Sequence, residues 1–215
     1  MTIRSTGARV AAYAWLTFAA LNLVDLVFGI TGNASRSLTA LGIGTLLVLG
    51  SGIAYTAGLR PAIIGDDDAV TIRNPLRDVW APWGAVREIE GTNAVTVRFA
   101  GPDGEELVTR AWVNQTSPRA QAKAERRTRK EQSKGPGFDL TGRTPAAFAA
   151  EQLNDLHERQ RPKTRSGAPD KVALAKEDAA DKPSKGTITW SIPALASLVV
   201  PLVALIGVVI AAAVS

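Results

Sequence analysis

Carboxylates, imidazoles and thiolates are the side chains that usually bind metals or move protons, and few of them are well placed in this sequence. Asp66, Asp67 and Asp68 form a run of three carboxylates that could bind a cation, but the further ligands of a calcium loop do not follow. The chain has one histidine, His157, and no cysteine. We therefore predict no enzymatic activity, no catalytic residue, no metal site and no cofactor. The aspartates are expected in a solvated turn, and His157 near a helix C-terminus, where the helix dipole favours it.

Two polar residues lie within an otherwise apolar stretch near the N-terminus. Asn22 and Asp25 are three residues apart and therefore share a face of a helix. A carboxylate inside a membrane helix can relay protons or ions. The other apolar stretches contain no acidic partner for such a relay. A contact between helices, or an ion pair between Asp25 and Arg36, is therefore the favoured interpretation.

The densest group of charges is basic and lies in the polar segment 114–143. Near an anionic membrane surface each cation contributes roughly 1 kcal/mol of attraction, so this segment could bind lipid headgroups or a partner. The alternative is that the cations only fix the membrane orientation and keep a loop solvated, and the sequence leaves both open. The candidate lipid-binding or partner-binding residues are Arg119, Lys123, Arg126, Arg127, Arg129, Lys130 and Lys134.

The basic composition also raises nucleic-acid binding, because the net charge is +5 and the pI is about 9.8. Proteins that bind single strands combine basic residues with aromatic side chains on which bases stack. The basic cluster has no interleaved aromatic residues. Membrane orientation explains the charge more simply, and no nucleic-acid partner is predicted.

Three long apolar runs enclose this basic middle, over residues 10–30, 38–59 and 188–214. A bilayer core needs about 20 mainly apolar residues per helix, so each run is long enough to span it. The first two predict a helical hairpin joined by the turn 31–37. The glycines of the second run lack the strand–turn–helix context of a dinucleotide-binding loop and are expected at a helix packing face. They are Gly42, Gly44, Gly50 and Gly52.

The charges that flank these runs predict an orientation in the plasma membrane. Cationic flanks remain on the cytoplasmic side. Arg36 is the sole cation in the hairpin turn, whereas the other flanks carry Arg4, Arg9, Arg60, Lys182 and Lys185. The expected topology has the N-terminus and the central domain inside, and the hairpin turn and the C-terminus outside.

The central region predicts short strands followed by one helix. Residues 69–73, 78–82, 94–99 and 106–113 have extended patterns separated by turn signals such as Gly101–Gly104. The pattern around Val86 and Ile89 does not decide between strand and turn. Regular short strands indicate an antiparallel sandwich or barrel.

An amphipathic helix is predicted from Pro145 to Arg161, with Thr144 as its N-cap. Its apolar stripe is expected to pack on the strands. That stripe contains Ala149, Leu153 and Leu156, with Phe148 beside them, and the opposite face carries Glu151, Asp155 and Glu158.

The predicted fold is thus an α+β membrane protein. It consists of a transmembrane hairpin (1–59), a small antiparallel domain with a C-terminal amphipathic helix (60–161), a flexible linker (162–186) and a C-terminal transmembrane helix (187–215). The segment 114–143 is an insertion in the domain.

Several short motifs carry a resemblance. The stretch Leu59–Pro61, the stretch Val70–Arg77, the pair Pro82–Trp83 and Val86 resemble the bacterial pleckstrin-homology (PH) family. The similarity is to the low-molecular-weight-antigen type found in small actinobacterial membrane proteins, and it covers roughly residues 60–112. Its signature turn consists of Arg73, Asn74, Pro75, Leu76 and Arg77, followed by Trp83.

The resemblance implies a non-enzymatic domain, often preceded by two transmembrane helices. We therefore expect a membrane-anchored binding or scaffolding module that recognises a cell-envelope protein or anionic lipid headgroups. The alternative is an accessory subunit of a membrane transporter or an envelope enzyme complex. A transporter by itself is disfavoured, because three spans are few and contain little polar chemistry.

Overall fold

The computed structural model describes residues 1–30, 37–113, 144–160 and 185–214. The chain divides into two compact units, which are described separately. The sheet unit comprises Met1–Arg4, Ala62–Asn74 and Asp78–Thr189, and the helical unit comprises Ser5–Pro61, Pro75–Arg77 and Trp190–Ser215. The basic insertion and nearly all of the predicted hairpin turn and of the predicted linker lie outside the described residues.

Three of the described helices are long and apolar enough to cross a membrane. They are α1 (Thr6–Phe28), α2 (Leu38–Ala54) with its π-helical extension η1 (Tyr55–Leu59), and α6 (Ile192–Val214). Serine hydroxyls set two of the starts, because Ser5 Oγ accepts from Ala8 N and Ser37 Oγ accepts from Ala40 N. The first helix therefore begins four residues before the apolar run.

The third helix begins later than the apolar run. Residues Thr187–Trp190 form a strand, β8, and α6 starts at Ile192. The residues Ile188 and Trp190 continue the hydrophobicity of the run, so composition alone merges strand and helix. The predicted C-terminal transmembrane helix, 187–215, was therefore wrong at its start, because the helix begins at Ile192.

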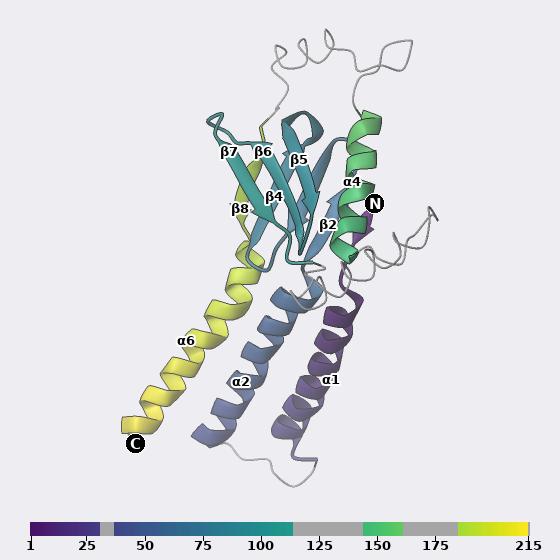
Figure 1. Ribbon diagram of the computed structural model, residues 1–215. Helices are drawn as coiled ribbons and strands as arrows, with labels where there is room; N and C mark the ends of the chain where they lie inside the picture. Colours follow the sequence, from purple (N-terminus) through teal and green to yellow (C-terminus); the bar gives the residue numbers. More distant parts are fainter. Residues whose placement is uncertain (31–36, 114–143, 161–184, 215) are drawn as a thin grey trace, which may run out of the picture. The chain divides into compact units, whose positions relative to one another are not determined.

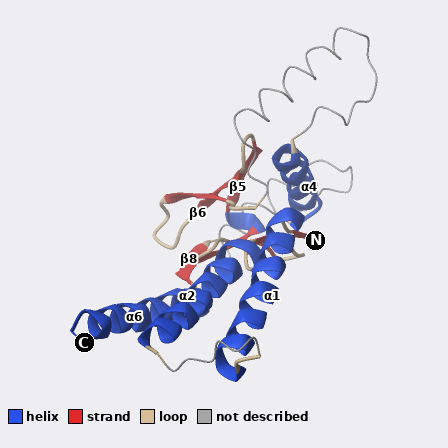
Figure 2. Cartoon of the chain, turned by 90° about the horizontal axis from the view of Figure 1, so that it is seen from below, coloured by secondary structure: helices blue, strands red, loops and turns tan. Residues whose placement is uncertain are grey.

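Helix α2 lies between α1 and α6 (Figure 1, Figure 2). Its glycines allow both neighbours to approach closely, as expected for small residues at a packing face. A Cβ atom at Gly44 would lie 3.2 Å from Leu26 of α1, and one at Gly42 would lie 3.6 Å from Val208 of α6. Gly50 contacts the ring of Trp15. The pattern shows that α2 runs antiparallel to both neighbours.

The strands of the sheet unit form two antiparallel sheets that do not close into a barrel. The five-stranded sheet has the order β1–β2–β3–β4–β8, with β1 (Thr2–Ile3), β2 (Ala62–Gly65), β3 (Ala69–Arg73) and β4 (Arg77–Pro82). The three-stranded sheet comprises β5 (Val86–Gly91), β6 (Val95–Ala100) and β7 (Glu106–Arg110), and the turn η2 (Trp83–Ala85) precedes it. Val86 and Ile89 thus belong to a strand.

The apolar residues that alternate with polar ones in the sequence form part of the core of this unit. In β6, Val95, Val97 and Phe99 are fully buried, whereas Thr96 and Arg98 between them remain partly exposed. Strand β7 ends at Arg110, three residues before the predicted end, although Ala111 N still donates to Val95 O of β6 at 2.8 Å. Trp112 N donates to the side chain of Asn74 rather than continuing the ladder.

Helix α4 (Pro145–Gln160) covers this core, beside β5 (Figure 1). Thr144 caps it as predicted, because its hydroxyl accepts from Ala147 N at 3.1 Å. Its buried stripe consists of Ala146, Ala149, Ala150 and Leu153, with Leu156 partly buried against the core.

The prediction that Phe148 packs beside this stripe was wrong, because its side chain is 48% exposed. The alanines let the helix backbone approach the sheet instead. At Gly91 of β5 an added Cβ would overlap the carbonyl oxygen of Ala146. The large side chain of Phe148 therefore does not fit into the contact between α4 and β5 and points outward.

Candidate functional site

The side chain of Asn74 links the turn between β3 and β4 to the end of β7. Asn74 Nδ2 donates to the carbonyl oxygen of Arg110 at 3.0 Å, and Asn74 Oδ1 accepts from Trp112 N at 2.8 Å. These partners are 36 and 38 residues away along the chain. Asn74 therefore fixes the position of the turn relative to the end of β7, and its role is structural.

Trp83 has a comparable role at the other end of β4. Its ring is buried, its Nε1 donates to the carbonyl oxygen of Asp66 at 2.9 Å, and its backbone N donates to Asp68 O at 3.1 Å. The imidazole of His157 stacks on the indole, with 5.7 Å between ring centroids. His157 thus lies in the last turns of α4, as expected, and contacts an aromatic ring there.

The aspartate run forms the expected turn. Asp66 Oδ1 accepts from the backbone N of Asp68 at 3.1 Å and of Ala69 at 2.7 Å. This is the usual way in which an aspartate stabilises its own turn. Among the described residues, no three His, Cys, Asp or Glu side chains are grouped closely enough to hold a metal ion.

The anchored turns and the strands from β2 to β7 lie in the region that the family comparison identifies, whereas β1, α4 and β8 lie outside it. Residues 60–131 match the bacterial PH domain family. The match includes the signature turn and Trp83, so the resemblance noted in the sequence is confirmed. A search of curated proteins and a search of solved structures each found no match. PH domains form a family of non-catalytic binding modules, which points to a binding or scaffolding role.

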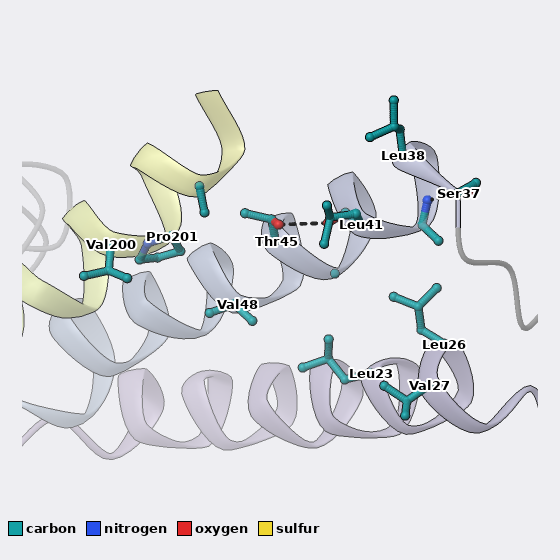
Figure 3. A pocket seen from close by; sticks show the side chains of 13 residues that line it. Leu23, Leu26, Val27, Ser37, Leu38, Leu41, Thr45, Val48, Val200 and Pro201 are labelled. Carbon is teal, nitrogen blue, oxygen red and sulfur yellow. Dashed lines mark hydrogen bonds between the residues drawn. The ribbon is translucent and has the colours of Figure 1, made fainter. Parts of the chain in front are cut away.

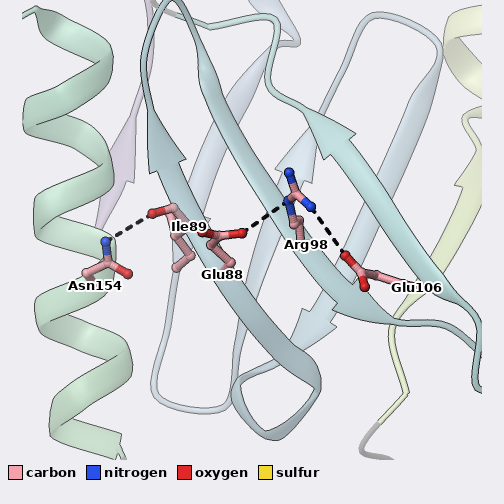
Figure 4. A network of polar contacts seen from close by, with 5 residues as sticks. All are labelled: Glu88, Ile89, Arg98, Glu106 and Asn154. Carbon is pink, nitrogen blue, oxygen red and sulfur yellow. Dashed lines mark hydrogen bonds and ion pairs between the residues drawn. The ribbon is translucent and has the colours of Figure 1, made fainter.

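The outer face of the three-stranded sheet carries a row of exposed ion pairs (Figure 4). Arg98 of β6 lies between Glu88 of β5 and Glu106 of β7, with N···O distances of 3.2 and 3.6 Å. The Nε atom of Arg98 is buried and has no partner with hydrogen-bond geometry, so the contact to Glu88 is a charge pair. All three side chains are about half exposed, and such pairs contribute roughly 0 to 1 kcal/mol each. This network orders the face but offers no catalytic group.

The free edge of the same sheet is the most distinctive exposed surface of the domain. Among the described strands β7 pairs with β6 alone, so no described strand covers its other edge. At the end of that edge, Arg110 O and Trp112 N bond to the side chain of Asn74. Two apolar side chains flank that edge, with Val108 55% exposed and Trp112 51% exposed. Sequence reasoning placed Trp112 inside a strand and missed this surface, because pairing partners are not visible in a single strand.

In the helical unit, a groove of about 720 Å³ opens where α1, α2 and α6 meet (Figure 3). Its walls include Leu23 and Leu26 of α1, Leu41 and Val48 of α2, and Pro201 of α6. The hydroxyls at its lining are satisfied within helices, since Thr45 Oγ1 donates to Leu41 O and Ser37 Oγ caps α2. Such a groove can hold an apolar ligand, but its lining residues include no side chain suited to catalysis.

Two polar side chains, those of Asn22 and Asp25, lie within α1. Asn22 Nδ2 donates to Phe18 O of the preceding turn at 2.8 Å, so its amide is engaged within its own helix. Arg36 lies outside the described residues, and the predicted pair with Asp25 stays a prediction.

The seven basic candidates between Arg119 and Lys134 also lie outside the described residues. The structure brings the signature residues Asn74 and Trp83 into structural contacts instead. Arg73 and Arg77 are both exposed, at the end of β3 and the start of β4.

Proposed function

We propose that this chain is a non-enzymatic, membrane-anchored binding and scaffolding module, whose PH domain lies on the cytoplasmic face of the plasma membrane. The observation that carries the proposal is the occurrence, in one chain, of a bacterial PH domain and three helices of spanning length and composition. Two of the helices precede the domain and one follows it. The chain is thereby an integral component that holds a binding domain close to the bilayer.

The charges in the described part of the helical unit support this orientation. Its charged residues are Arg9, Asp25, Arg60 and Arg77. Arg9 begins α1 and Arg60 follows the last turn of η1, and the antiparallel packing of α1 and α2 brings these ends together. Asp25 lies towards the opposite end. Cations concentrate at the cytoplasmic end of membrane helices, so this end is assigned to the inside.

The partner we propose for the PH domain is an extended segment of a cell-envelope protein that pairs with the free edge of β7. An exposed edge strand binds peptides through its unpaired N–H and C=O groups, while neighbouring side chains provide selectivity. Val108 and Trp112 supply apolar contacts there. The basic cluster 119–134 is proposed to add electrostatic attraction to anionic headgroups or to the same partner.

Photo-crosslinking from the full-length chain in living cells tests this function. A photoreactive amino acid at Val108 or at Trp112 is expected to yield a discrete protein adduct. The control position is Asp155, which is exposed on the outer face of α4, away from the sheet edge. Absence of adducts at both edge positions, or the same adducts at Asp155, would contradict the proposed partner surface.

A further inference from the structure

One exposed arginine of the helical unit is stacked on an exposed tryptophan. The guanidinium carbon of Arg77 lies 4.2 Å from the ring centroid of Trp190, well within the range of a cation–π interaction. Both side chains are exposed, with Trp190 at 56%. Within the described residues, the ion pairs of Arg98 with Glu88 and Glu106 do not involve Arg77. The ring of Trp190 holds the guanidinium in place and leaves its positive charge intact.

This pair is fixed at the point where a membrane helix begins. The backbone N of Ser191 donates to the carbonyl oxygen of Leu76 at 2.9 Å, so the residue before Arg77 is tied to the residue after Trp190. Helix α6 starts at the next position, with Ile192 77% exposed and no acidic residue in its first turn. Free N–H groups at a helix start favour negative charge.

The same end of the helical unit carries a second arrangement of this kind. In α1 the guanidinium of Arg9 lies 6.0 Å from the ring centroid of Tyr13. Arg60 follows η1 at the end of α2. The close contacts of Gly58 with Ala12 and of Gly52 with Ser197 show that the starts of α1 and α6 lie at this end of α2. Arginines and amphipathic aromatic rings therefore gather at one level of the unit.

Tryptophan and tyrosine prefer the headgroup level of a membrane, where the ring is partly apolar and partly hydrated. An arginine that stacks through its planar face keeps its N–H donors in the plane of the guanidinium, directed outward. Those donors match the geometry of a phosphate oxygen pair. At the headgroup level the phosphate within reach is that of a phospholipid.

We propose that Arg77 and Trp190 form a binding site for the phosphate of an anionic phospholipid at the start of α6. Arg77 binds the phosphate through its outward N–H groups, and Trp190 orients the guanidinium and contacts the upper acyl region. Arg9 adds positive charge at the same level, which selects an anionic lipid over a zwitterionic one. The site rests on the proposed membrane anchoring of α1, α2 and α6, and is independent of the partner surface at β7.

Native mass spectrometry of the full chain released from nanodiscs tests the site. The nanodiscs contain equal amounts of phosphatidylglycerol and phosphatidylcholine, and the measured quantity is the ratio of the two lipids retained. The wild-type chain should retain phosphatidylglycerol preferentially. Arg77→Ala should lower that preference about fivefold, as expected for one arginine at a membrane surface. Arg77→Lys and Trp190→Leu, which keep a cation but lose the stack, should show smaller losses.

The matched control is Arg159→Ala, which removes one charge from an exposed position on α4. It should leave the lipid ratio unchanged. An equal ratio for Arg77→Ala and Arg159→Ala would overturn the site. If Arg77→Ala unfolds, as judged by its melting temperature in the same nanodiscs, Arg77→Lys and Trp190→Leu decide the question instead, and wild-type ratios in both would overturn it.

Inorganic phosphate distinguishes a lipid headgroup from a free anion. Millimolar phosphate added to the nanodisc solution before release should not displace phosphatidylglycerol, because the acyl chains also contribute to binding. Displacement would overturn the assignment to a lipid. A chain that fails to enter nanodiscs would overturn both the membrane anchoring and this site, whereas a chain that enters but shows no lipid preference would overturn the site alone.

Discussion

Gly52 of α2 lies directly against the backbone carbonyl oxygen of Ser197 in α6, so closely that a Cβ atom at position 52 would overlap that oxygen. Four residues after Ser197 stands Pro201, which has no N–H to donate to this carbonyl. The proline and the glycine therefore both affect the carbonyl oxygen of Ser197. Pro201 removes its usual hydrogen-bond donor within α6, and Gly52 allows the backbone of α2 to approach it.

Replacing Gly52 by Ala should loosen the contact between α2 and α6. Because the added methyl group meets backbone, which cannot move aside like a flexible side chain, we expect a loss of about 1 to 3 kcal/mol in stability. Thermal unfolding of the full chain in detergent measures it. The same change at Gly207 of α6, where nothing lies within 4 Å of the added Cβ, serves as the control. It should be neutral or slightly stabilising, since alanine favours helices. Equal effects at both positions would refute the close packing.

Leu153 is expected to be the main anchor of α4. Its side chain is fully buried among the core residues of both sheets. Leu153→Ala should lower the free energy of unfolding by about 2 to 5 kcal/mol through lost burial and a residual cavity. Asp155→Ala, on the exposed face of the same helix, should change it by less than about 0.5 kcal/mol. Urea unfolding followed by tryptophan fluorescence measures both, and comparable small effects would mean that α4 does not pack.

Asn74 allows its two hydrogen bonds to be separated. Asn74→Asp keeps the acceptor for Trp112 N but loses the donor to Arg110 O. Asn74→Ala loses both and should cost about 1 to 3 kcal/mol, at 0.5 to 1.5 for each bond. Hydrogen exchange of the Trp112 amide should therefore accelerate in the alanine variant and stay slow in the aspartate variant. Equal acceleration in both would show that the side chain does not accept from Trp112.

The sequence alone predicted whether a residue is buried where burial follows from local periodicity. Val95, Val97 and Phe99 alternate with polar residues, and all three are buried. The cap at Thr144 and the Asp66 turn were likewise predictable, because their partners are two or three residues away.

Other features depend on partners that are distant in the chain. Nothing near Asn74 indicates that it bonds to residues 36 and 38 positions later. The segment Thr187–Trp190 was merged with the third span, because it is apolar and becomes a strand only by pairing in the five-stranded sheet. Phe148 was placed beside the apolar stripe of α4, whereas the close approach of α4 to Gly91 demands alanines. The proposed lipid site likewise joins Arg77 to a tryptophan 113 residues away.

The central claim, a membrane-anchored PH domain that faces the cytoplasm, is tested most directly by the accessibility of single cysteines. The chain has no native cysteine, so each introduced thiol reports alone. Asp103→Cys places it in the exposed loop between β6 and β7, Ser35→Cys between the first two spans, and Ser215→Cys at the C-terminus. A membrane-impermeant maleimide applied to intact cells should label positions 35 and 215, and should label position 103 only after the membrane is opened. Labelling of position 103 in intact cells would contradict the account.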